Sequence, residues 1–129
     1  MDKERKKIVS IQQACQLSEV FKQGGKKVVL ATGDYDIFHP GHLFFLEDAT
    51  QYGDILIVGV ASDRLIKHSK NKSRPVFNEN DRLTIVSALE IVSYALIFSD
   101  IIELIEQVNP NILAISPTSN KKYNKEKLR

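Results

Sequence analysis

The chain has 129 residues, 43% hydrophobic and 26% charged, which suits one domain with a buried core. Its 18 basic and 16 acidic residues leave a net charge of +2. Much of the basic excess lies at the two ends, with no aromatics interleaved on an obvious face, which argues against nucleic-acid binding. One cysteine excludes an intrachain disulfide, and no apolar run reaches the length of a membrane span. We therefore expect a cytoplasmic protein that binds neither nucleic acid nor membranes.

The first half of the chain alternates helical and strand patterns. Ser10 and Gln13 have the spacing of a capping box, and apolar residues at helical spacing follow them. The apolar runs KVVLA and ILIVGVA are typical of buried strands. In chain order, we expect a helix over residues 10–23, a strand over 27–31, a helix over 41–52 and a strand over 55–61.

The second half continues the alternation after an irregular basic stretch. A short helix is expected near Asp63, and KHSKNKSRP (67–75) then interrupts the pattern, because the residue before a proline disfavours helix. We expect a helix over 78–90, a strand over 93–98, a helix from Asp100 to 108 and a last strand over 111–116.

Strands that are apolar on both faces and alternate with helices predict a parallel sheet with right-handed crossovers. The fold class is therefore α/β, a small doubly wound (Rossmann-like) parallel sheet with helices on both faces. We expect one domain over residues 1–129, with a charged tail at 1–9 and a basic tail at 117–129. Ligands of such sheets bind outside the carboxyl ends of the strands.

Two of the three histidines, His39 and His42, flank a Pro-Gly where the first strand leads into a helix. A helix N-terminus offers free N–H groups and a favourable dipole to a phosphate, and each imidazole adds an N–H donor. The same histidines could instead hold a metal together with Asp34 and Asp36, or simply cap the helix. Spacing alone leaves these three interpretations open.

The segment GDYDIFHPGH (33–42) resembles the G-x-F-D-x-x-H-x-G-H signature of the cytidylyltransferase-like nucleotidyltransferases. Residues 7–115, including ASDRLIKHSKNKSRPVFNENDR (61–82), are similar to the adenylyltransferase module of the bacterial heptose-phosphate enzymes. The resemblance implies transfer of a nucleoside monophosphate from the Mg²⁺ complex of a nucleoside triphosphate, ATP in preference to CTP, to a phosphorylated acceptor, with release of pyrophosphate. By family the acceptor is a sugar phosphate, and a homodimer is compatible with the resemblance.

The resemblance also implies roles for individual residues. It gives catalytic roles to three basic side chains, His39, His42 and Lys67. It implies nucleotide contacts, several through phosphates or backbone, for Thr32, Gly33, Asp34, Tyr35, Gly41, Lys70, Arg74 and Arg82. Arg82 has a structural ion pair as its alternative, and Asp36 is expected to orient the turn through backbone hydrogen bonds or, alternatively, to help hold Mg²⁺. No protein metal ligand is predicted.

The chain departs from the family pattern at two places. Asp34 puts a carboxylate where a triphosphate would bind, which opposes binding unless the group is protonated, turned away or metal-bound. The segment after the last strand, AISPTSNKKY, also differs from that of the heptose-phosphate branch. These departures leave an alternative function, a non-catalytic nucleotide-binding module that keeps the HPGH phosphate site.

Overall fold

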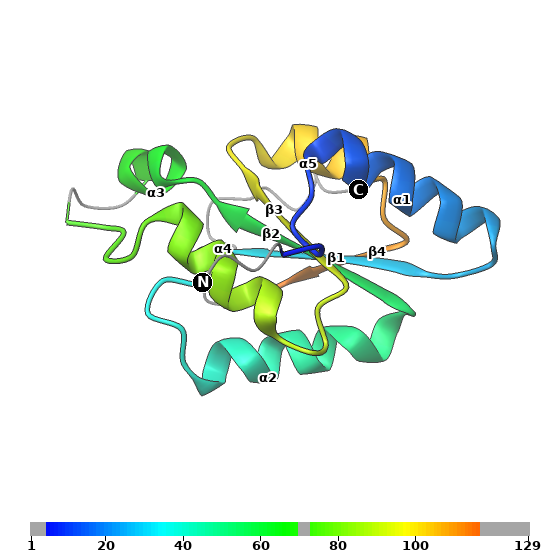
Figure 1. Ribbon diagram of the computed structural model, residues 1–129, viewed down its shortest axis with the longest axis horizontal. Helices are drawn as coiled ribbons and strands as arrows, with labels where there is room; N and C mark the ends of the chain where they lie inside the picture. The colour runs from blue at the N-terminus through cyan, green and yellow to red at the C-terminus, as the bar shows by residue number, and fades with distance from the viewer. Residues whose placement is uncertain (1–4, 70–72, 117–129) are drawn as a thin grey trace.

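The computed structural model describes residues 5–69 and 73–116, and their core is a four-stranded parallel sheet between two helical layers (Figure 1). The strands are β1 (Val28–Gly33), β2 (Ile55–Ala61), β3 (Tyr94–Phe98) and β4 (Ile112–Ile115). Their spatial order is β3-β2-β1-β4, so the strand order reverses beside β1. The predicted α/β class is confirmed. The predicted basic tail at 117–129 lies outside the described residues.

The helices also follow the expected order. They are α1 (Ile11–Gln23), α2 (Pro40–Ala49) with a 3-10 turn η1 (Thr50–Tyr52), α3 (Asp63–Ser69), α4 (Glu79–Ala88) and α5 (Ile101–Val108). The capping box is formed, because the Ser10 hydroxyl accepts from the Gln13 N–H at 3.1 Å and the Gln13 side chain accepts from the Ser10 N–H at 2.8 Å. The helix expected over 78–90 ends earlier, because Leu89 has extended backbone angles.

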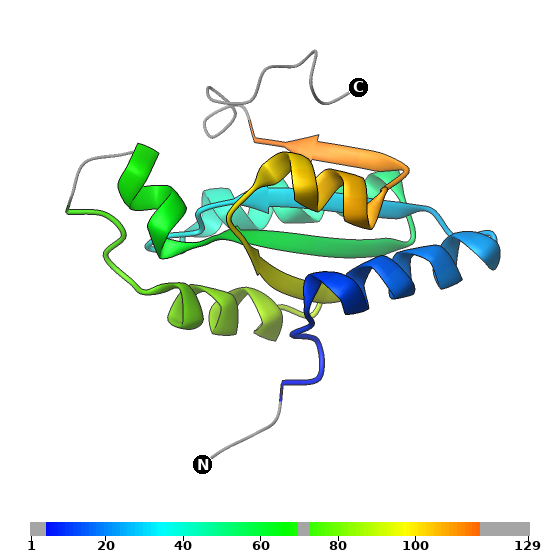
Figure 2. The ribbon, with the colours of Figure 1, turned by 90° about the horizontal axis from the view of Figure 1, so that it is seen from above.

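The sheet separates two apolar cores. Val28 and Leu30 of β1 pack with the side chains of α1 and α5, whereas Val29 and Ala31 pack with those of α2 and α4. Figures 1 and 2 show the corresponding layers, with α1 and α5 on one face of the sheet and α2 and α4 on the other. Alternation along a strand that is buried on both faces gives this division.

One edge of the sheet is covered by the N-terminal segment. Ala95 of β3 accepts from the Val9 N–H at 3.0 Å and donates to the Lys7 carbonyl at 2.9 Å. Residues 7–9 therefore lie along β3 and are not part of a charged tail, which corrects the expectation for 1–9. The reason is the apolar Ile8, which packs against the core cluster beneath α4.

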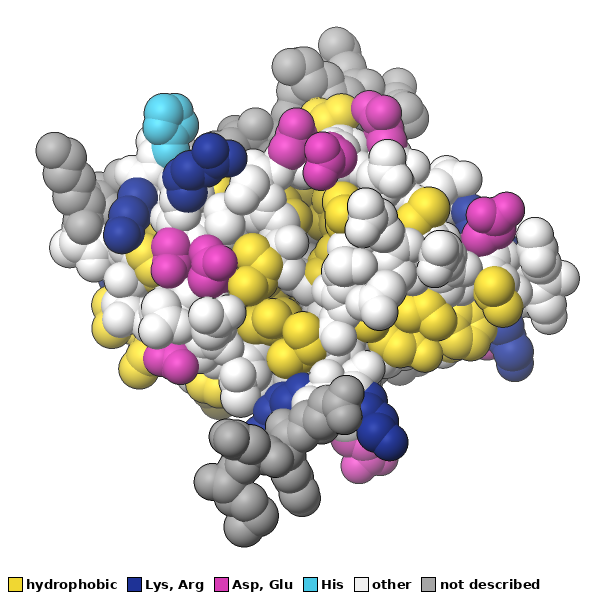
Figure 3. Space-filling view, turned by 45° about the horizontal axis from the view of Figure 1, so that its top comes forward, with side chains coloured by type: hydrophobic (Ala, Val, Ile, Leu, Met, Phe, Trp, Pro, Cys, Tyr) yellow, Lys and Arg dark blue, Asp and Glu magenta, His cyan; other side chains and the backbone are white. Residues whose placement is uncertain are grey.

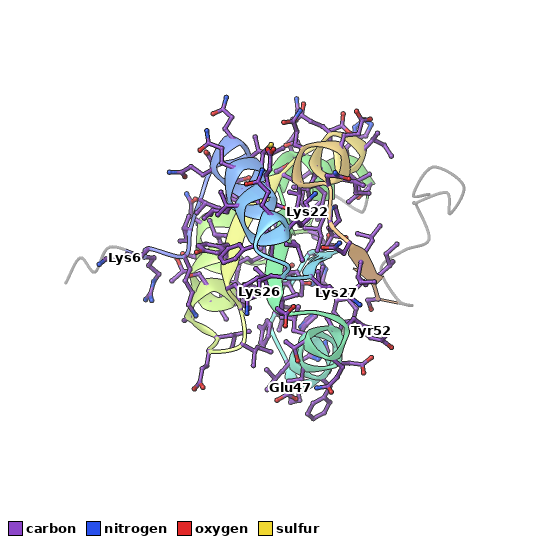
Figure 4. The ribbon with its side chains drawn as sticks, turned by 90° about the vertical axis from the view of Figure 1, so that its right-hand side faces the viewer. Lys6, Lys22, Lys26, Lys27, Glu47 and Tyr52 are labelled. Atoms are coloured by element: carbon purple, nitrogen blue, oxygen red, sulfur yellow. The ribbon has the colours of Figure 1, made fainter. Side chains whose placement is uncertain are left out.

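The two ends of the sheet carry different groups. Figure 4 views the amino ends of the strands, where the end of α1 and the loop into β1 contribute Lys22, Lys26 and Lys27. The turn carrying HPGH follows the carboxyl end of β1, at the opposite end. None of the helices in the described ranges is long and apolar enough to cross a membrane.

Candidate functional site

The two histidines form the cap of α2 with their own side chains. His39 is the N-cap residue, and its Nδ1 accepts from the Gly41 N–H at 3.0 Å. His42 Nδ1 accepts from the His39 N–H at 3.1 Å, so each imidazole binds a backbone group at the helix start. Their ring centroids are 4.0 Å apart at an interplanar angle of 32°. The pair is therefore built into the local structure of the helix terminus.

These bonds select one tautomer of each ring. A neutral imidazole has one N–H and one acceptor nitrogen, and Nδ1 is the acceptor in both histidines. The proton of each neutral ring is therefore on Nε2, at the end of the ring distal to the capped backbone. Two adjacent Nε2–H groups can together donate hydrogen bonds to one anion.

Electrostatics keep His42 uncharged near neutral pH. Burial lowers the pKa of His42 below its usual value of 6.5, and the neighbouring His39 lowers it further. Asp34 and Asp36 act in the opposite direction without reversing the shift. The ring therefore acts at neutral pH as a hydrogen-bond donor without a formal charge.

We expect nitrogen-detected NMR to show the Nε2–H tautomer for both rings and a pKa of His42 below 6.5 in the free protein. Addition of a triphosphate is expected to raise the pKa of His42, because a nearby anion favours the protonated ring. Adenosine, which carries no phosphate, serves as the control ligand and is expected to leave that pKa unchanged. A rise with adenosine, or none with triphosphate, would contradict the assignment of the pair to phosphate.

The backbone of the α2 terminus differs from the sequence expectation. Free N–H groups were expected to face an anion, but Pro40 has none. The Gly41 N–H is bonded to the His39 ring, and the His42 N–H is bonded to the His39 carbonyl at 3.0 Å. The first backbone donors of α2 are therefore already bonded, one to an imidazole and one to a carbonyl, so the imidazoles themselves present the donors at this terminus.

The turn between β1 and α2 holds the His42 ring through aromatic contacts. Tyr35 and Ile37 both have a left-handed backbone, with φ of 54° and 49°. The buried Tyr35 ring lies against Gly33, where an added Cβ would come within 3.0 Å of it. Tyr35 also meets the His42 ring edge-on at 5.7 Å between centroids. Strained residues persist where the surroundings over-determine them, which is common at functional sites.

Asp36 links this turn to the segment before α4. Its carboxylate accepts from the Val76 N–H at 2.7 Å and the Phe77 N–H at 3.0 Å. Arg74, predicted to contact phosphate, has its guanidinium 3.5 Å from the same carboxylate. The expected backbone hydrogen bonds of Asp36 are therefore present, but they join two segments about 40 residues apart in sequence.

We expect acid to weaken the fold through Asp36. Burial raises the pKa of this carboxyl, but hydrogen bonds from Phe77, Val76 and Arg74 outweigh that effect, and the net pKa lies below 3.8. The stabilisation is therefore complete well above pH 3.8 and is lost as the pH falls through the folded-state pKa.

Asp36→Asn tests this expectation, because the amide cannot reproduce the charged bonds. Near neutral pH it is expected to lower the free energy of unfolding by about 1–3 kcal/mol. Urea unfolding of both proteins at descending pH should bring their stabilities together once the wild-type carboxyl is protonated. A difference that stays constant with pH would show that the charge of Asp36 contributes nothing.

Arg82 lies beneath the site. Its side chain is 1% exposed, and Nη2 forms an ion pair with Asp63 at 2.8 Å. Nη1 donates to the carbonyls of Asp34 and Ala61 at 2.8 and 2.7 Å, and Nε donates to the Phe77 carbonyl at 2.9 Å. The structural ion pair that the sequence left open is therefore present. Asp63 was not singled out from the sequence, although its place directly after an apolar strand was a signal.

The remaining predicted residues lie in different environments. Lys67 is exposed on α3, where basic side chains appear at the surface at the left of Figure 3. Asp34 is half-buried, and its effect on the pKa of His42 shows that its charge acts on that ring. Lys70 lies outside the described residues. Thr32 is 1% exposed, and its hydroxyl has no hydrogen-bond partner among the described residues.

Thr32→Val is expected to raise the free energy of unfolding by roughly 1–3 kcal/mol, because it removes a buried hydroxyl without a partner. Thr84→Val is the matched control, since the Thr84 hydroxyl donates to the Asn80 carbonyl at 2.8 Å. Thermal or urea unfolding measures both. A loss of stability in Thr32→Val would show that its hydroxyl has a partner after all.

The carboxylates of the turn do not form a metal site. Within residues 5–69 and 73–116, no three His, Cys, Asp or Glu side chains are placed to hold a metal ion together. Both oxygens of Asp36 accept protein hydrogen bonds, and the Nδ1 atoms of both histidines accept backbone N–H groups. The residues of this turn therefore do not fit a resident Mg²⁺ ion.

The chain is similar in sequence to known proteins. The chain is 44% identical over 91 residues to the bifunctional protein HldE of Aliarcobacter butzleri, a match covering 69% of this chain and 19% of that protein. It is 46% identical over 89 residues to the FAD synthase of Methanococcoides burtonii, covering 67% of this chain and 60% of that protein. The chain thus spans about a fifth of the first relative and three-fifths of the second.

A solved structure has the same fold. The lipopolysaccharide core biosynthesis protein of Thermoplasma volcanium superposes with a TM-score of 0.72 at 33% identity, covering 81% of this chain and 84% of that one. The family model described as cytidylyltransferase-like matches residues 30–128, which include the HPGH turn, α3 and Arg82. With the parallel sheet and the histidine-capped α2 at the end of β1, this match shows that the chain belongs to the cytidylyltransferase-like family.

Proposed function

We propose that the protein is a nucleotidyltransferase that moves a nucleoside monophosphate from a Mg²⁺-bound nucleoside triphosphate to a phosphorylated acceptor and releases pyrophosphate. The observation that carries the proposal is the pair of imidazoles at the end of β1, 4.0 Å apart, whose Nδ1 atoms are held by backbone N–H groups. Membership of the cytidylyltransferase-like family supports the same chemistry.

In the proposed reaction, an oxygen of the acceptor phosphate attacks the α-phosphorus in line. A new P–O bond forms while the bond from the α-phosphorus to the oxygen bridging it to the β-phosphate breaks, so pyrophosphate leaves with the electron pair. The Nε2–H groups of His39 and His42 stabilise the charge that develops on the phosphoryl oxygens, and Lys67 adds positive charge from α3. Catalysis is positioning and charge stabilisation, without a covalent enzyme intermediate.

We propose ATP as the donor and a sugar phosphate as the acceptor, on the resemblance to adenylyltransferase modules. A flavin acceptor is the second candidate, favoured by the 46% identity to a FAD synthase. FAD is flavin mononucleotide joined to AMP through a pyrophosphate bond, so its synthesis from ATP is the same transfer to a different phosphate. Both acceptors use one phosphate site and differ in the group that the phosphate carries.

A module that binds nucleotide without turnover is a third candidate. It is favoured by the engagement of Arg74 with Asp36, which draws one predicted phosphate ligand toward a carboxylate. Asp34 acts in the same direction, because its charge opposes that of a phosphate near His42.

Calorimetric titration with Mg²⁺·ATP and Mg²⁺·CTP, followed by a pyrophosphate-release assay with sugar phosphates and flavin mononucleotide, separates the three candidate functions. Binding of ATP that a His39→Ala, His42→Ala double variant loses, with release of pyrophosphate, supports the transferase and identifies the acceptor. Binding without release from any acceptor supports the non-catalytic module. Failure to bind either nucleotide would exclude all three candidates.

A further inference from the structure

Resting on the proposed function, we infer that Arg82 is a positioning residue, although its own side chain is buried. It holds the histidine turn, α3 and the segment with Arg74 in fixed positions relative to one another. Four of its five N–H groups are bonded within the protein, at 2.7 to 2.9 Å, and the side chain is 1% exposed. A guanidinium in this state has little left to offer a ligand. Its effect on the site must pass through the groups that it binds.

Each group bonded to Arg82 belongs to a segment that carries a candidate site residue. The Asp34 carbonyl lies in the turn that leads to His39. The Ala61 carbonyl lies at the end of β2, and the Asp63 carboxylate lies at the start of α3, which follows β2 and carries Lys67. The Phe77 carbonyl lies just after Arg74. One side chain thus joins the histidine turn, α3 and the Arg74 segment.

A second link makes the arrangement specific. Asp36, in the histidine turn, accepts from the N–H of Phe77 at 3.0 Å, while the carbonyl of the same residue accepts from Arg82. The backbone of Phe77 is therefore held on both sides, once by the turn and once by the guanidinium. A shift of the Arg74 segment would break bonds to both.

Lysine cannot replace this arginine. The planar fork of a guanidinium reaches acceptors on three sides, whereas an ammonium group donates from one point. In Arg82→Lys the positive charge stays near Asp63, but the carbonyls of Asp34, Ala61 and Phe77 cannot all be reached. The three segments are then no longer held in fixed relative positions, and a displacement of about 1 Å in a site residue is enough to lower affinity or rate.

The test uses inorganic tripolyphosphate and Mg²⁺·ATP as separate probes, titrated calorimetrically into the full chain. We expect Arg82→Lys to weaken the binding of both by the same factor, on the order of 10-fold to 100-fold. Equal losses are expected because the phosphate site alone is disturbed. Leu104→Ala is the control for lost stability, since Leu104 of α5 is fully buried in the core cluster on the face of the sheet opposite α2 and α4.

Both variants are measured at a temperature where circular dichroism shows them fully folded. Weaker binding in Arg82→Lys with wild-type binding in Leu104→Ala supports positioning. Equal losses in the two variants, or wild-type affinity in Arg82→Lys, would overturn it while leaving the proposed function intact. A wild-type chain that binds neither probe would instead overturn the proposed function, and the positioning role with it.

If Arg82→Lys does not fold, Asp63→Asn replaces it as the informative variant. The amide keeps the shape of the side chain but weakens the charged bond to Nη2, so that the guanidinium is less firmly oriented. We then expect the affinity for both probes to fall by a smaller common factor, about 3-fold to 10-fold. Unchanged affinity in a folded Asp63→Asn variant would overturn the inference.

Discussion

His42→Ala is expected to lower the rate of nucleotidyl transfer by about 100-fold to 1,000-fold, the usual effect of removing one donor from a site where charge develops. The Nε2–H of His42 is such a donor, because its Nδ1 is held by the His39 N–H at 3.1 Å. The variant also frees that N–H at an exposed helix end, where water can replace the ring. Stability should therefore change little, while turnover falls.

His68→Ala is the matched control, because His68 is exposed on α3 and is not part of the histidine pair. Pyrophosphate release under saturating triphosphate measures the rate in both variants, and thermal unfolding checks that both are folded. A rate for His42→Ala equal to that of His68→Ala would show that the pair caps the helix and does nothing else, which is the structural interpretation that the sequence left open.

Gly41→Ala is expected to weaken triphosphate binding by about 10-fold to 100-fold without removing any polar group. A Cβ on Gly41 would lie 2.7 Å from Cε1 and 3.0 Å from Nδ1 of His39. The imidazole is exposed and can swing away, so the fold need not pay for the contact. The swing breaks the bond from the Gly41 N–H to the ring and separates the two donors.

Stability distinguishes this effect from general damage. Alanine is favoured over glycine inside a helix by about 1 kcal/mol, which offsets the loss of the cap bond, so the Tm of Gly41→Ala should stay close to that of the wild type. Gly24→Ala is a suitable control, since a Cβ there meets only ordinary contacts, the nearest at 3.5 Å. Calorimetric affinity that is unchanged in Gly41→Ala would show that the orientation of the His39 ring does not matter for phosphate.

The site combines a preformed donor pair with charges that oppose an anion. The histidine rings are bonded to the backbone and oriented before any ligand binds, whereas Asp34 and Asp36 bring negative charge toward His42. Arg74 partly offsets this charge through its contact with Asp36. Positive charge delivered with the substrate as Mg²⁺ would offset it further, because the triphosphate then arrives with a smaller net charge.

Local sequence patterns were sufficient to predict the helices and strands and to locate the HPGH motif. Strand β2 lies where ILIVGVA predicted it, and α1 begins after the Ser10 cap, because apolar periodicity and capping depend on residues within one or two turns. The position of the histidine pair at the start of a helix after β1 also followed from a short segment. Its bonds join residues only two or three positions apart, so they form wherever that segment folds.

Only the tertiary structure decided which groups the other site residues bind. Arg82 is 48 residues from the Asp34 carbonyl, and Asp36 is 41 residues from the Phe77 N–H. From the sequence, Arg82 could be a phosphate ligand or part of an ion pair. The choice depends on its burial beneath loops, and these loops meet only when the parallel strands bring their carboxyl ends together. The same long-range packing attached residues 7–9 to β3, where composition alone had suggested a solvated tail. Patterns of a few residues determine which elements form, whereas the partners of a buried charge are determined by how those elements assemble.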